Sequence, residues 1–169
     1  MQRILIIGNA GSGKSTFSKK LAQKLQLPLV HLDRIYWKGN WEHLEREEFD
    51  EALQAELIKP QWIIDGNFNR TFPHRLAYCD TVFFFDLPAI SCFWGITKRI
   101  FQNYGKTRAD MGGNCPEYFD KQKISLYKGV LNFNKTRRQG YYELLEKASD
   151  VRVVIFRSRK QADRFIESL

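Results

Sequence analysis

Five short stretches of the chain are apolar at consecutive positions instead of alternate ones. Such runs are typical of strands buried on both faces, and β-branched and aromatic residues dominate them. Each run is followed closely by a glycine, an aspartate or an arginine. The predicted strands are residues 3–7, 29–32, 62–64, 81–85 and 151–156.

Helical patterns lie between these strands. Phe17, Leu21 and Leu25 recur at i, i+4 and i+8, on one face of a helix that ends before Pro28. Further helices are predicted at about 44–58, from 88 onward, near 118, near 136, and after Ser158 as N-cap. Strands that alternate with helices predict an α/β fold with a parallel sheet covered on both faces. The length suits a single domain, residues 1–169.

Most of the positive charge belongs to one segment. The sequence has 27 Lys and Arg against 19 Asp and Glu, a net charge of +8. Residues 98–138 contain ten basic and three acidic residues, nearly the whole excess. Within this segment, residues 103–114 are polar and glycine-bearing and are expected to bury little. A local positive field attracts the phosphates of a nucleotide or a nucleic acid, although a solvated basic face without a ligand has the same composition.

Cysteines and apolar stretches exclude several classes of protein. Cys79, Cys92 and Cys115 lie far apart, with no C-x-x-C and no histidine at zinc-ligand spacing, so we expect reduced thiols. The apolar runs are far shorter than the ~20 residues of a membrane-spanning helix, and no export signal is recognisable. We therefore expect a cytoplasmic protein without a membrane partner.

One glycine-rich motif points to a ligand. Residues 8–15 (GNAGSGKS) fit the pattern G-x-x-x-x-G-K-[ST], between a predicted buried strand and a helix. Backbone N–H groups of such a loop point at phosphates, Lys14 would bridge the β- and γ-phosphates, and the Ser15 hydroxyl would hold Mg²⁺. The motif predicts a site for a nucleoside triphosphate. A dinucleotide site would need G-x-G-x-x-G, but Thr16 occupies the third glycine position.

Carboxylates follow three of the predicted strands. Asp33, Asp65 and Asp86 come directly after the second, third and fourth strands. The carboxyl ends of parallel strands meet at one edge of a sheet, next to the glycine-rich motif. One carboxylate could orient the water shell of a metal, and one could accept a proton from a second substrate. Aspartate at such positions also caps helices, which is the alternative interpretation, for Asp86 in particular.

Arginine side chains in the basic segment suit phosphoryl transfer. Arg99, Arg108, Arg137 and Arg138 flank the polar stretch. We expect this segment, around residues 99–138, to close over the nucleotide as a lid. A planar guanidinium contacts two phosphate oxygens at once, which neutralises charge on the transferred group.

Together these segments resemble the FlaR-type topology-modulation proteins, P-loop proteins related to adenylate kinase. The likeness runs from end to end and includes, besides the glycine-rich loop, His31-Leu-Asp33, Trp62–Asn67, Gly105–Arg108, Cys115-Pro116 and Arg157–Arg159. The resemblance implies an adenylate-kinase-like or shikimate-kinase-like fold, with a five-stranded parallel sheet in the order 2-3-1-4-5 and a helical lid. It implies no particular substrate.

Related kinases suggest roles for individual residues. By resemblance to nucleoside monophosphate kinases, Asp65 would hold a magnesium-bound water and Arg70 would bind an acceptor phosphate. The sequence departs from their pattern by one extra residue before Arg70. By resemblance to small-alcohol kinases, Asp33 would bind the accepting hydroxyl. The loop at 157–159 is where related kinases seat the adenine.

The sequence therefore predicts an ATP- and Mg²⁺-dependent kinase for a nucleoside monophosphate or a small hydroxyl compound. The alternative is an ATP-binding protein that associates with nucleic acid and affects DNA topology. Basic residues in the lid are interleaved with aromatic ones that could stack bases, although such aromatics more often belong to a core. These aromatic residues are Phe101, Tyr104, Tyr118, Phe119 and Tyr127.

The candidate site residues fall into four groups. Candidate catalytic residues are Lys14, Asp33, Arg99, Arg108 and Arg137. Candidate ATP-binding residues are Gly8, Gly11, Ser12, Gly13, Lys14, Ser15, Thr16, Arg157 and Arg159. Candidate acceptor-binding residues are Asp33, Arg34, Asn67 and Arg70. Candidate metal-binding residues are Ser15 and, through water, Asp65.

Overall fold

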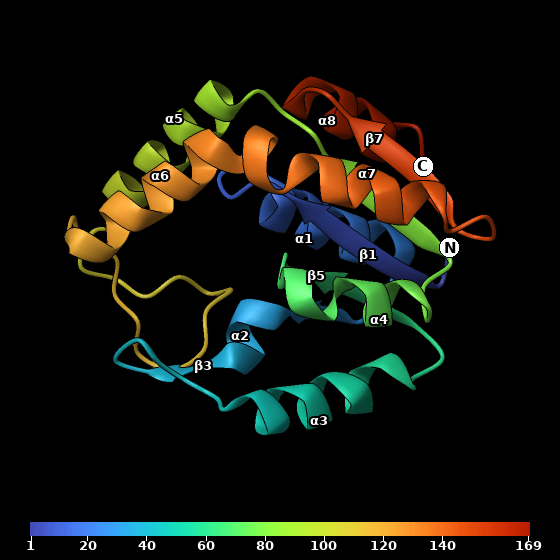
Figure 1. Cartoon of the computed structure of the whole chain (residues 1–169), viewed down its shortest axis with the longest axis horizontal. Coiled ribbons are helices and arrows are strands. Elements are labelled where there is room, and N and C mark those ends of the chain that lie inside the picture. Colours follow the sequence, from blue (N-terminus) through green and yellow to red (C-terminus); the bar gives the residue numbers. More distant parts are fainter.

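Five parallel strands form the centre of the molecule (Figure 1). The computed structural model describes the backbone of residues 1–169 and the side chains of residues 1–121 and 123–169. The strands are β1 (Arg3–Gly8), β2 (Leu29–His31), β5 (Trp62–Asp65), β6 (Thr81–Phe85) and β7 (Arg152–Phe156). Their order across the sheet is β2-β5-β1-β6-β7.

This order differs in numbering from the expected 2-3-1-4-5 because the sequence analysis missed a hairpin. The strands β3 (Trp37–Gly39) and β4 (Glu42–His43) form a separate antiparallel pair where a loop was expected. Counted in chain order within the large sheet alone, β2-β5-β1-β6-β7 is the arrangement 2-3-1-4-5. The parallel α/β fold is therefore confirmed.

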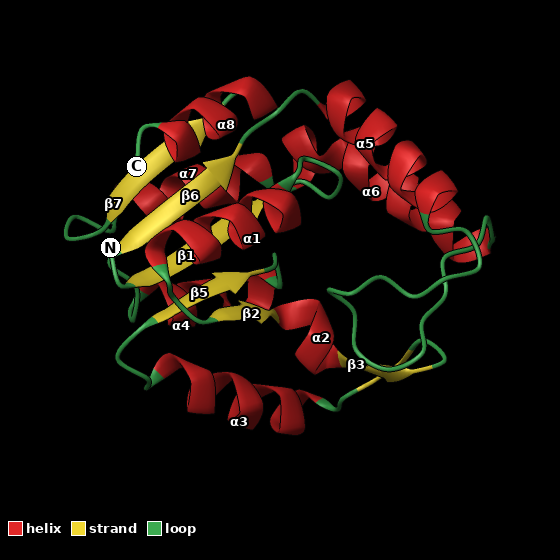
Figure 2. Ribbon diagram, turned by 180° about the vertical axis from the view of Figure 1, so that it is seen from behind, coloured by secondary structure: helices red, strands yellow, loops and turns green.

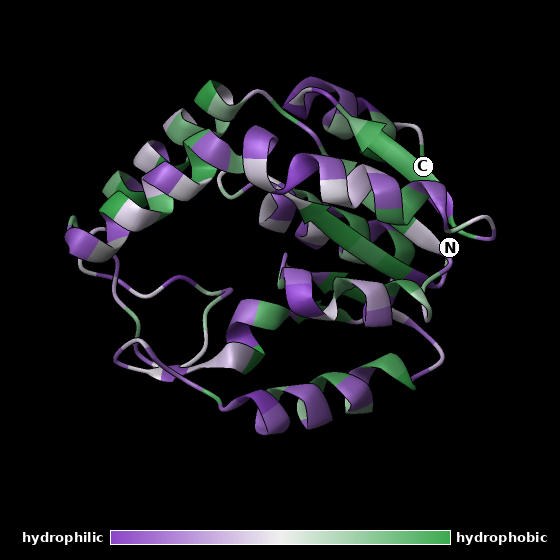
Figure 3. Ribbon diagram, in the orientation of Figure 1, coloured by the Kyte–Doolittle hydropathy of each residue, from purple (hydrophilic) through white to green (hydrophobic). Residues whose placement is uncertain are grey.

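Helices cover both faces of the sheet (Figure 2). They are α1 (Lys14–Leu25), α2 (Leu32–Tyr36), α3 (Arg46–Leu57), α4 (Phe72–Leu76), α5 (Ala89–Gln102), α6 (Lys121–Thr136), α7 (Arg138–Glu146) and α8 (Arg159–Glu167), with a 3₁₀ turn at Asn69–Thr71. Leu5 and Ile7 pack with α3, α4 and α7, whereas Ile4 and Ile6 pack with α1, α5 and α8. Both faces of β1 are thus buried, which explains its uninterrupted apolar run. Figure 3 shows the strands as hydrophobic bands under helices of mixed hydropathy.

The second strand is shorter than predicted, and Asp33 does not follow it directly. Leu29, Val30 and His31 pair with Ile63, Ile64 and Asp65 of β5, and the pairing ends there because β5 ends. The chain then turns into α2, which carries Asp33 in its first turn. Two short elements, α4 and the preceding 3₁₀ turn, were also not predicted. The predicted N-cap at Ser158 is confirmed, since its hydroxyl accepts a hydrogen bond from the backbone N–H of Gln161.

The expectation that residues 103–114 bury little is wrong. Met111 and Asp110 are buried, as is the following Cys115. The segment docks onto the β3–β4 hairpin, where the backbone N–H of Asn40 donates to the carbonyl of Asn114 at 2.7 Å. A Cβ atom on Gly112 would lie 2.0 Å from the carbonyl oxygen of Trp37, so only glycine permits this approach. The lid segment (residues 99–138) therefore meets the hairpin across the sheet edge (Figure 1).

The aromatic residues of the lid segment are mostly not core residues. Phe101, Tyr104, Tyr118 and Phe119 are 44–67% exposed, and they contact one another on the surface. Tyr127 is half-buried and packs against Phe93. The general expectation of a core role is thus wrong for the first four. The three cysteines are free and buried. Among the described residues, no helix combines the length and apolar character needed to span a membrane.

Candidate functional site

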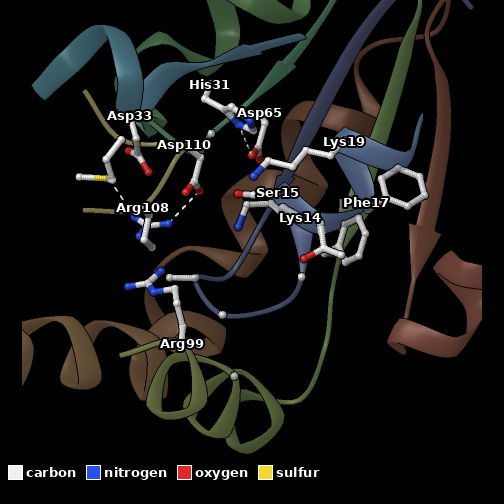
Figure 4. Close-up of a pocket in the computed structure, with 18 of the residues that line it drawn as sticks. Lys14, Ser15, Phe17, Lys19, His31, Asp33, Asp65, Arg99, Arg108 and Asp110 are labelled. Atoms are coloured by element: carbon white, nitrogen blue, oxygen red, sulfur yellow. Dashed lines mark hydrogen bonds and ion pairs between the residues drawn. The ribbon is translucent and has the colours of Figure 1, made fainter. Parts of the chain in front are cut away.

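A cavity of about 1220 Å³ lies at the carboxyl edge of the sheet (Figure 4). The glycine-rich loop and the start of α1 form its floor, α2 and the end of β5 one wall, and α5 and the loop after it the other. Lys14, Ser15, Asp33, Asp65 and Asp110 all line it. The sheet topology thus brings together residues that lie far apart in the chain, as expected at the carboxyl ends of parallel strands.

The glycine-rich loop owes its shape to backbone conformations that favour glycine. Gly8, Gly11 and Gly13 have φ values of +133°, +76° and +107°. A Cβ atom on Gly11 would lie 2.3 Å from the carbonyl oxygen of Cys92 in α5. Gly95, one turn further along α5, would carry its Cβ 2.1 Å from the carbonyl oxygen of Gly11. These close contacts fix the loop against α5 and direct the N-terminus of α1 into the cavity.

Lys14 lies in the curl of the loop. Its ammonium group donates to the carbonyl oxygens of Gly8 and Asn9, both at 2.8 Å, and the side chain is buried. Burial lowers the pKa of Lys14, while the nearby carboxylates of Asp65 and Asp33 oppose this change. A buried cation held only by neutral carbonyls is well suited to an anionic ligand in the adjacent space.

Two buried oxygen atoms in and beside the glycine-rich loop have neither a hydrogen-bond nor an ion-pair partner among the described side chains. Oδ2 of Asp65 is 3.0 Å from Nδ1 of His31, but Oδ1 of Asp65 is unpaired, as is the hydroxyl of Ser12. Buried polar atoms in folded proteins normally have a hydrogen-bond partner. The orphaned oxygens lie in the loop and beside it, where a phosphate, a water or a hydrated cation would provide that partner.

Ser15 and Asp110 lie where the loop and the lid segment face the same cavity. A guanidinium nitrogen of Arg108 lies 2.8 Å from the carboxylate of Asp110. Burial by itself would raise the pKa of Asp110, but the Arg108 guanidinium, a backbone N–H and the nearby Ser15 hydroxyl bring it below its usual range. Asp110 was not predicted as a site residue.

Asp33 is the least satisfied carboxylate at the site. It is half-buried and lines the cavity on the far side from Lys14. Burial raises the pKa of Asp33, and the negative charges of Asp65 and Asp110 act in the same direction, against the opposing effect of Arg108. A carboxylate with a raised pKa and a free oxygen is suited to accept a proton.

Three cations of the lid segment surround one carboxylate. Glu117 is 1% exposed, and its oxygens lie 3.4 Å from Arg99, 3.0 Å from Arg108 and 2.8 Å from Lys123. Burial would raise the pKa of Glu117, but the three cations lower it. One carboxylate cannot neutralise three cations, so positive charge remains on this wall of the cavity. Arg137 lines the cavity as well.

Some predicted residues lie outside the cavity lining. Arg70 forms a two-point ion pair with Asp50 of α3, at 2.6 and 2.7 Å. Arg34 is exposed and does not contribute to the lining. Asn67 does line the cavity, and its side-chain oxygen accepts a hydrogen bond from the backbone N–H of Gly8 at 3.1 Å.

Asp86 belongs to a separate cluster and not to a helix cap. Its carboxylate accepts hydrogen bonds from Arg138 at 2.7 and 2.8 Å, from the hydroxyl of Tyr142, and from Arg157. The capping interpretation is therefore wrong, since Asp86 ties α7 and the end of β7 to β6. Arg138 and Arg157 are held away from the cavity by this carboxylate.

Arg159 remains at the loop. Its guanidinium donates to the carbonyl oxygens of Gly11 at 2.8 Å, Ser12 at 3.2 Å and Ser91 at 2.9 Å, and it lines the cavity. Of the two arginines predicted to bind the nucleotide from the 157–159 loop, only this one contacts the glycine-rich loop.

Sequence reasoning missed several lining residues. Asp110 and Glu117 could have been suspected from the sequence, because they are isolated acidic residues within a strongly basic segment. Trp37, Trp41 and Phe68 could not, since they line the cavity only after the β3–β4 hairpin and the end of β5 have been brought together.

The chain is similar in fold to a known kinase. A crystal structure of shikimate kinase from Bacteroides thetaiotaomicron matches it with a TM-score of 0.52 and 16% sequence identity, over 99% of this chain and 95% of that one. No family model matches the sequence, and no curated protein does. The likeness establishes a shikimate-kinase-like P-loop fold, and nothing in these comparisons favours the nucleic-acid alternative.

Proposed function

We propose that this protein is an ATP- and Mg²⁺-dependent kinase that transfers the γ-phosphoryl group to a small molecule, a nucleoside monophosphate or a small hydroxyl compound. The observation that carries this proposal is the glycine-rich loop with its buried Lys14, which faces Asp33 across one large cavity. The shikimate-kinase-like fold and the resemblance of the sequence to adenylate-kinase-related FlaR-type proteins support it.

The nucleotide would bind at the floor of the cavity. Backbone N–H groups of the glycine-rich loop and of the start of α1 would hold the phosphates, except that of Gly8, which donates to Asn67. Lys14 would exchange its carbonyl partners for phosphate oxygens, and Arg159 would lie near the base. Arg157 would reach the nucleotide only after release from Asp86.

The residues present fit a magnesium ion bound together with the nucleotide. Among the described side chains, no group of three His, Cys, Asp or Glu could hold a metal by itself. Mg²⁺ is commonly held by substrate phosphates, waters and one or two protein oxygens, which the Ser15 hydroxyl and, through water, the orphaned oxygen of Asp65 would supply. When bound, Mg²⁺ neutralises charge on the phosphates.

Transfer would run between the two walls of the cavity. Asp33 would accept the proton of the acceptor's hydroxyl group while the hydroxyl oxygen forms a bond to the γ-phosphorus. The bond between the γ-phosphorus and the oxygen that links it to the β-phosphate breaks, which leaves ADP. Arg99 and Arg137 would stabilise negative charge on the transferred group, and Arg108 would add its positive charge while it stays paired with Asp110 and Glu117. We further propose that residues 1–169 act as one domain, with the segment around 99–138 as its lid.

An ADP-release screen tests the proposal. Purified protein with ATP and Mg²⁺ is offered nucleoside monophosphates and small alcohols, and Lys14→Ala provides the blank. We expect at least one acceptor to raise ADP release above the blank. If wild type and Lys14→Ala release ADP equally with every acceptor, the proposed activity is refuted.

A further inference from the structure

We infer that the acceptor is an uncharged or cationic hydroxyl compound, not one that carries a phosphate or a carboxylate. The inference rests on the proposed kinase function and narrows its substrate class. It concerns the acceptor side of the cavity, which we define by Asp33, Trp37, Trp41, Asp65, Phe68 and Asp110.

Uncompensated negative charge lies on the acceptor side. Asp65 is 5% exposed and its Oδ1 has no partner. Asp33 accepts no hydrogen bond from the side chains that the structure describes, and Asp65 and Asp110 are its nearest acidic neighbours. Figure 4 shows these carboxylates converging on the same space. If Mg²⁺ engages Asp65 and Ser15, Asp33 still faces the acceptor alone.

The cation that lowers the pKa of Asp33 most is already engaged. Arg108 donates to Asp110 at 2.8 Å and to the sulfur of Met111 at 2.8 Å, and its Nε lies 3.0 Å from Glu117 in an ion pair. Lys123 contacts Glu117 at 2.8 Å and lies 4.2 Å from the ring centre of Trp41. Neither has a free face for an acceptor anion unless a buried ion pair is broken, which is costly.

Two arginines near the end of β5 that could bind a phosphate on the acceptor are paired with other groups. Arg70 is paired with Asp50 outside the cavity lining. Arg75, fully buried below the end of β5, donates to the backbone carbonyls of Gly66, Asn67 and Phe68. Arg137 also lines the cavity, at the N-cap of α7, but the six residues that define the acceptor side include no arginine.

Aromatic rings complete the acceptor side. Trp37 and Trp41 lie edge to face with their ring centres 5.3 Å apart, and Phe68 packs against Tyr36 of α2. The face of an aromatic ring attracts cations and packs against the C–H groups of neutral rings and polyols. The ammonium of Lys123 on Trp41 is an example within this protein. Carboxylates and aromatic faces together select against anions.

Matched acceptors that differ only in charge test the inference. Initial rates of ADP release are measured with ethylene glycol, ethanolamine and glycolate, with glucose, glucosamine and glucuronate, and with adenosine against AMP. We expect the best neutral or cationic compound to exceed every anionic one by at least ~10-fold in kcat/KM, because like charges in the site repel each other. An anionic compound as the best acceptor, or a panel without turnover by protein that binds ATP, would overturn the inference.

Variants separate this inference from the proposed function. Asp33→Asn removes one negative charge and should narrow the rate ratio between neutral and anionic compounds. Glu56→Gln, which removes a negative charge from a surface ion pair with Lys59, should leave that ratio as it is. If Asp33→Asn abolishes turnover, ligand-observed NMR with Mg²⁺ and a non-hydrolysable ATP analogue measures the same ratio from binding. An unchanged ratio contradicts the inference, whereas failure to bind ATP contradicts the proposed function instead.

Discussion

At the scale of single residues, some charged groups of the site have hydrogen-bond or ion-pair partners and others lack them. Lys14 and Glu117 are buried and fully engaged by carbonyls or cations. Asp33 and Oδ1 of Asp65 accept no hydrogen bond from the described side chains. An unpaired buried carboxylate costs stability, so its presence beside the glycine-rich loop indicates a role in binding or transfer.

Asp33→Asn tests that role. We expect kcat to fall by ~10²–10⁴-fold, the usual contribution of a general base, while the affinity for ATP stays the same. An equal loss of ATP affinity would instead assign Asp33 to the metal. Steady-state kinetics and calorimetry on the same preparation distinguish the two results.

The pH dependence follows from the direction of the pKa shift. Burial raises the pKa of Asp33 above the usual value of 3.8. As the pH is lowered, the wild-type rate should therefore begin to fall at a higher pH than it would with an ordinary carboxylate as the base. Because the raised pKa favours the protonated form in the folded state, ionisation costs stability once the pH exceeds that pKa. Asp33→Asn should therefore unfold at a higher urea concentration than wild type at pH 8. A lower urea midpoint would contradict this assignment.

Glu117→Gln tests the buried charge cluster. The variant keeps the shape of the side chain but leaves Arg99 and Lys123 without a counter-charge and Arg108 with Asp110 alone. We expect a loss of ~3–5 kcal/mol in the free energy of unfolding, measured by urea titration. The control Glu56→Gln, in a surface pair with Lys59, should cost less than ~1 kcal/mol. Equal effects of the two substitutions would show that the cluster is not a stabilising centre.

At the scale of elements, α5 positions the glycine-rich loop. The backbones of Gly11 and Gly95 approach each other so closely that a methyl group on Gly95 would lie 2.1 Å from the carbonyl oxygen of Gly11. Because this oxygen belongs to the backbone and cannot rotate away, α5 and the loop would have to separate. The position of the glycine-rich loop thus depends on a helix that provides one wall of the same cavity.

Gly95→Ala tests this dependence. We expect the substitution to weaken ATP binding by ~10-fold or more, since a shift of about an ångström misaligns the phosphate contacts. Gly140→Ala is the matched control, because a Cβ there meets nothing within 4 Å, and helix propensity should make it neutral or stabilising by ~0.5–1 kcal/mol. Equal ATP affinity in the two variants would contradict the dependence.

The predictability of the elements depended on where their stabilisation comes from. The five large-sheet strands could be predicted because both faces are buried, which leaves apolar runs such as Thr81–Phe85 in the sequence. The helices with apolar stripes could be predicted for the same reason. The β3–β4 hairpin and α4 could not, since they are short and depend on contacts with distant segments, such as Asn40 with Asn114.

The site was predictable to a similar degree. The motif at residues 8–15 and the aspartates near strand ends are local signals, and the structure brings Lys14, Ser15, Asp33 and Asp65 to one cavity. The direction of each arginine is not a local property. Arg70 and Arg157 are turned away by Asp50 and Asp86, carboxylates at a distance in sequence that the spacing of the arginines does not reveal.

At the scale of the whole molecule, the lid segment and the β3–β4 hairpin meet over the cavity (Figure 2). Asn114 contacts Asn40, and the indole N–H of Trp41 donates to the carbonyl of Pro116 at 3.3 Å. The two sides that would bind nucleotide and acceptor are thus joined by a few polar contacts. In the proposed kinase, this closure would exclude water from the phosphoryl group in transfer and would have to open to release products.

The proposed function requires that the glycine-rich loop binds a nucleoside triphosphate. Isothermal titration calorimetry with ATP and Mg²⁺ measures this binding directly. We predict binding with a Kd below about 1 mM, and at least ~10-fold weaker binding by Lys14→Ala, which loses charge-assisted contacts to the phosphates. Circular dichroism of the variant verifies that it is folded. No heat of binding at millimolar ATP, or equal affinities of wild type and a folded Lys14→Ala variant, would contradict the account.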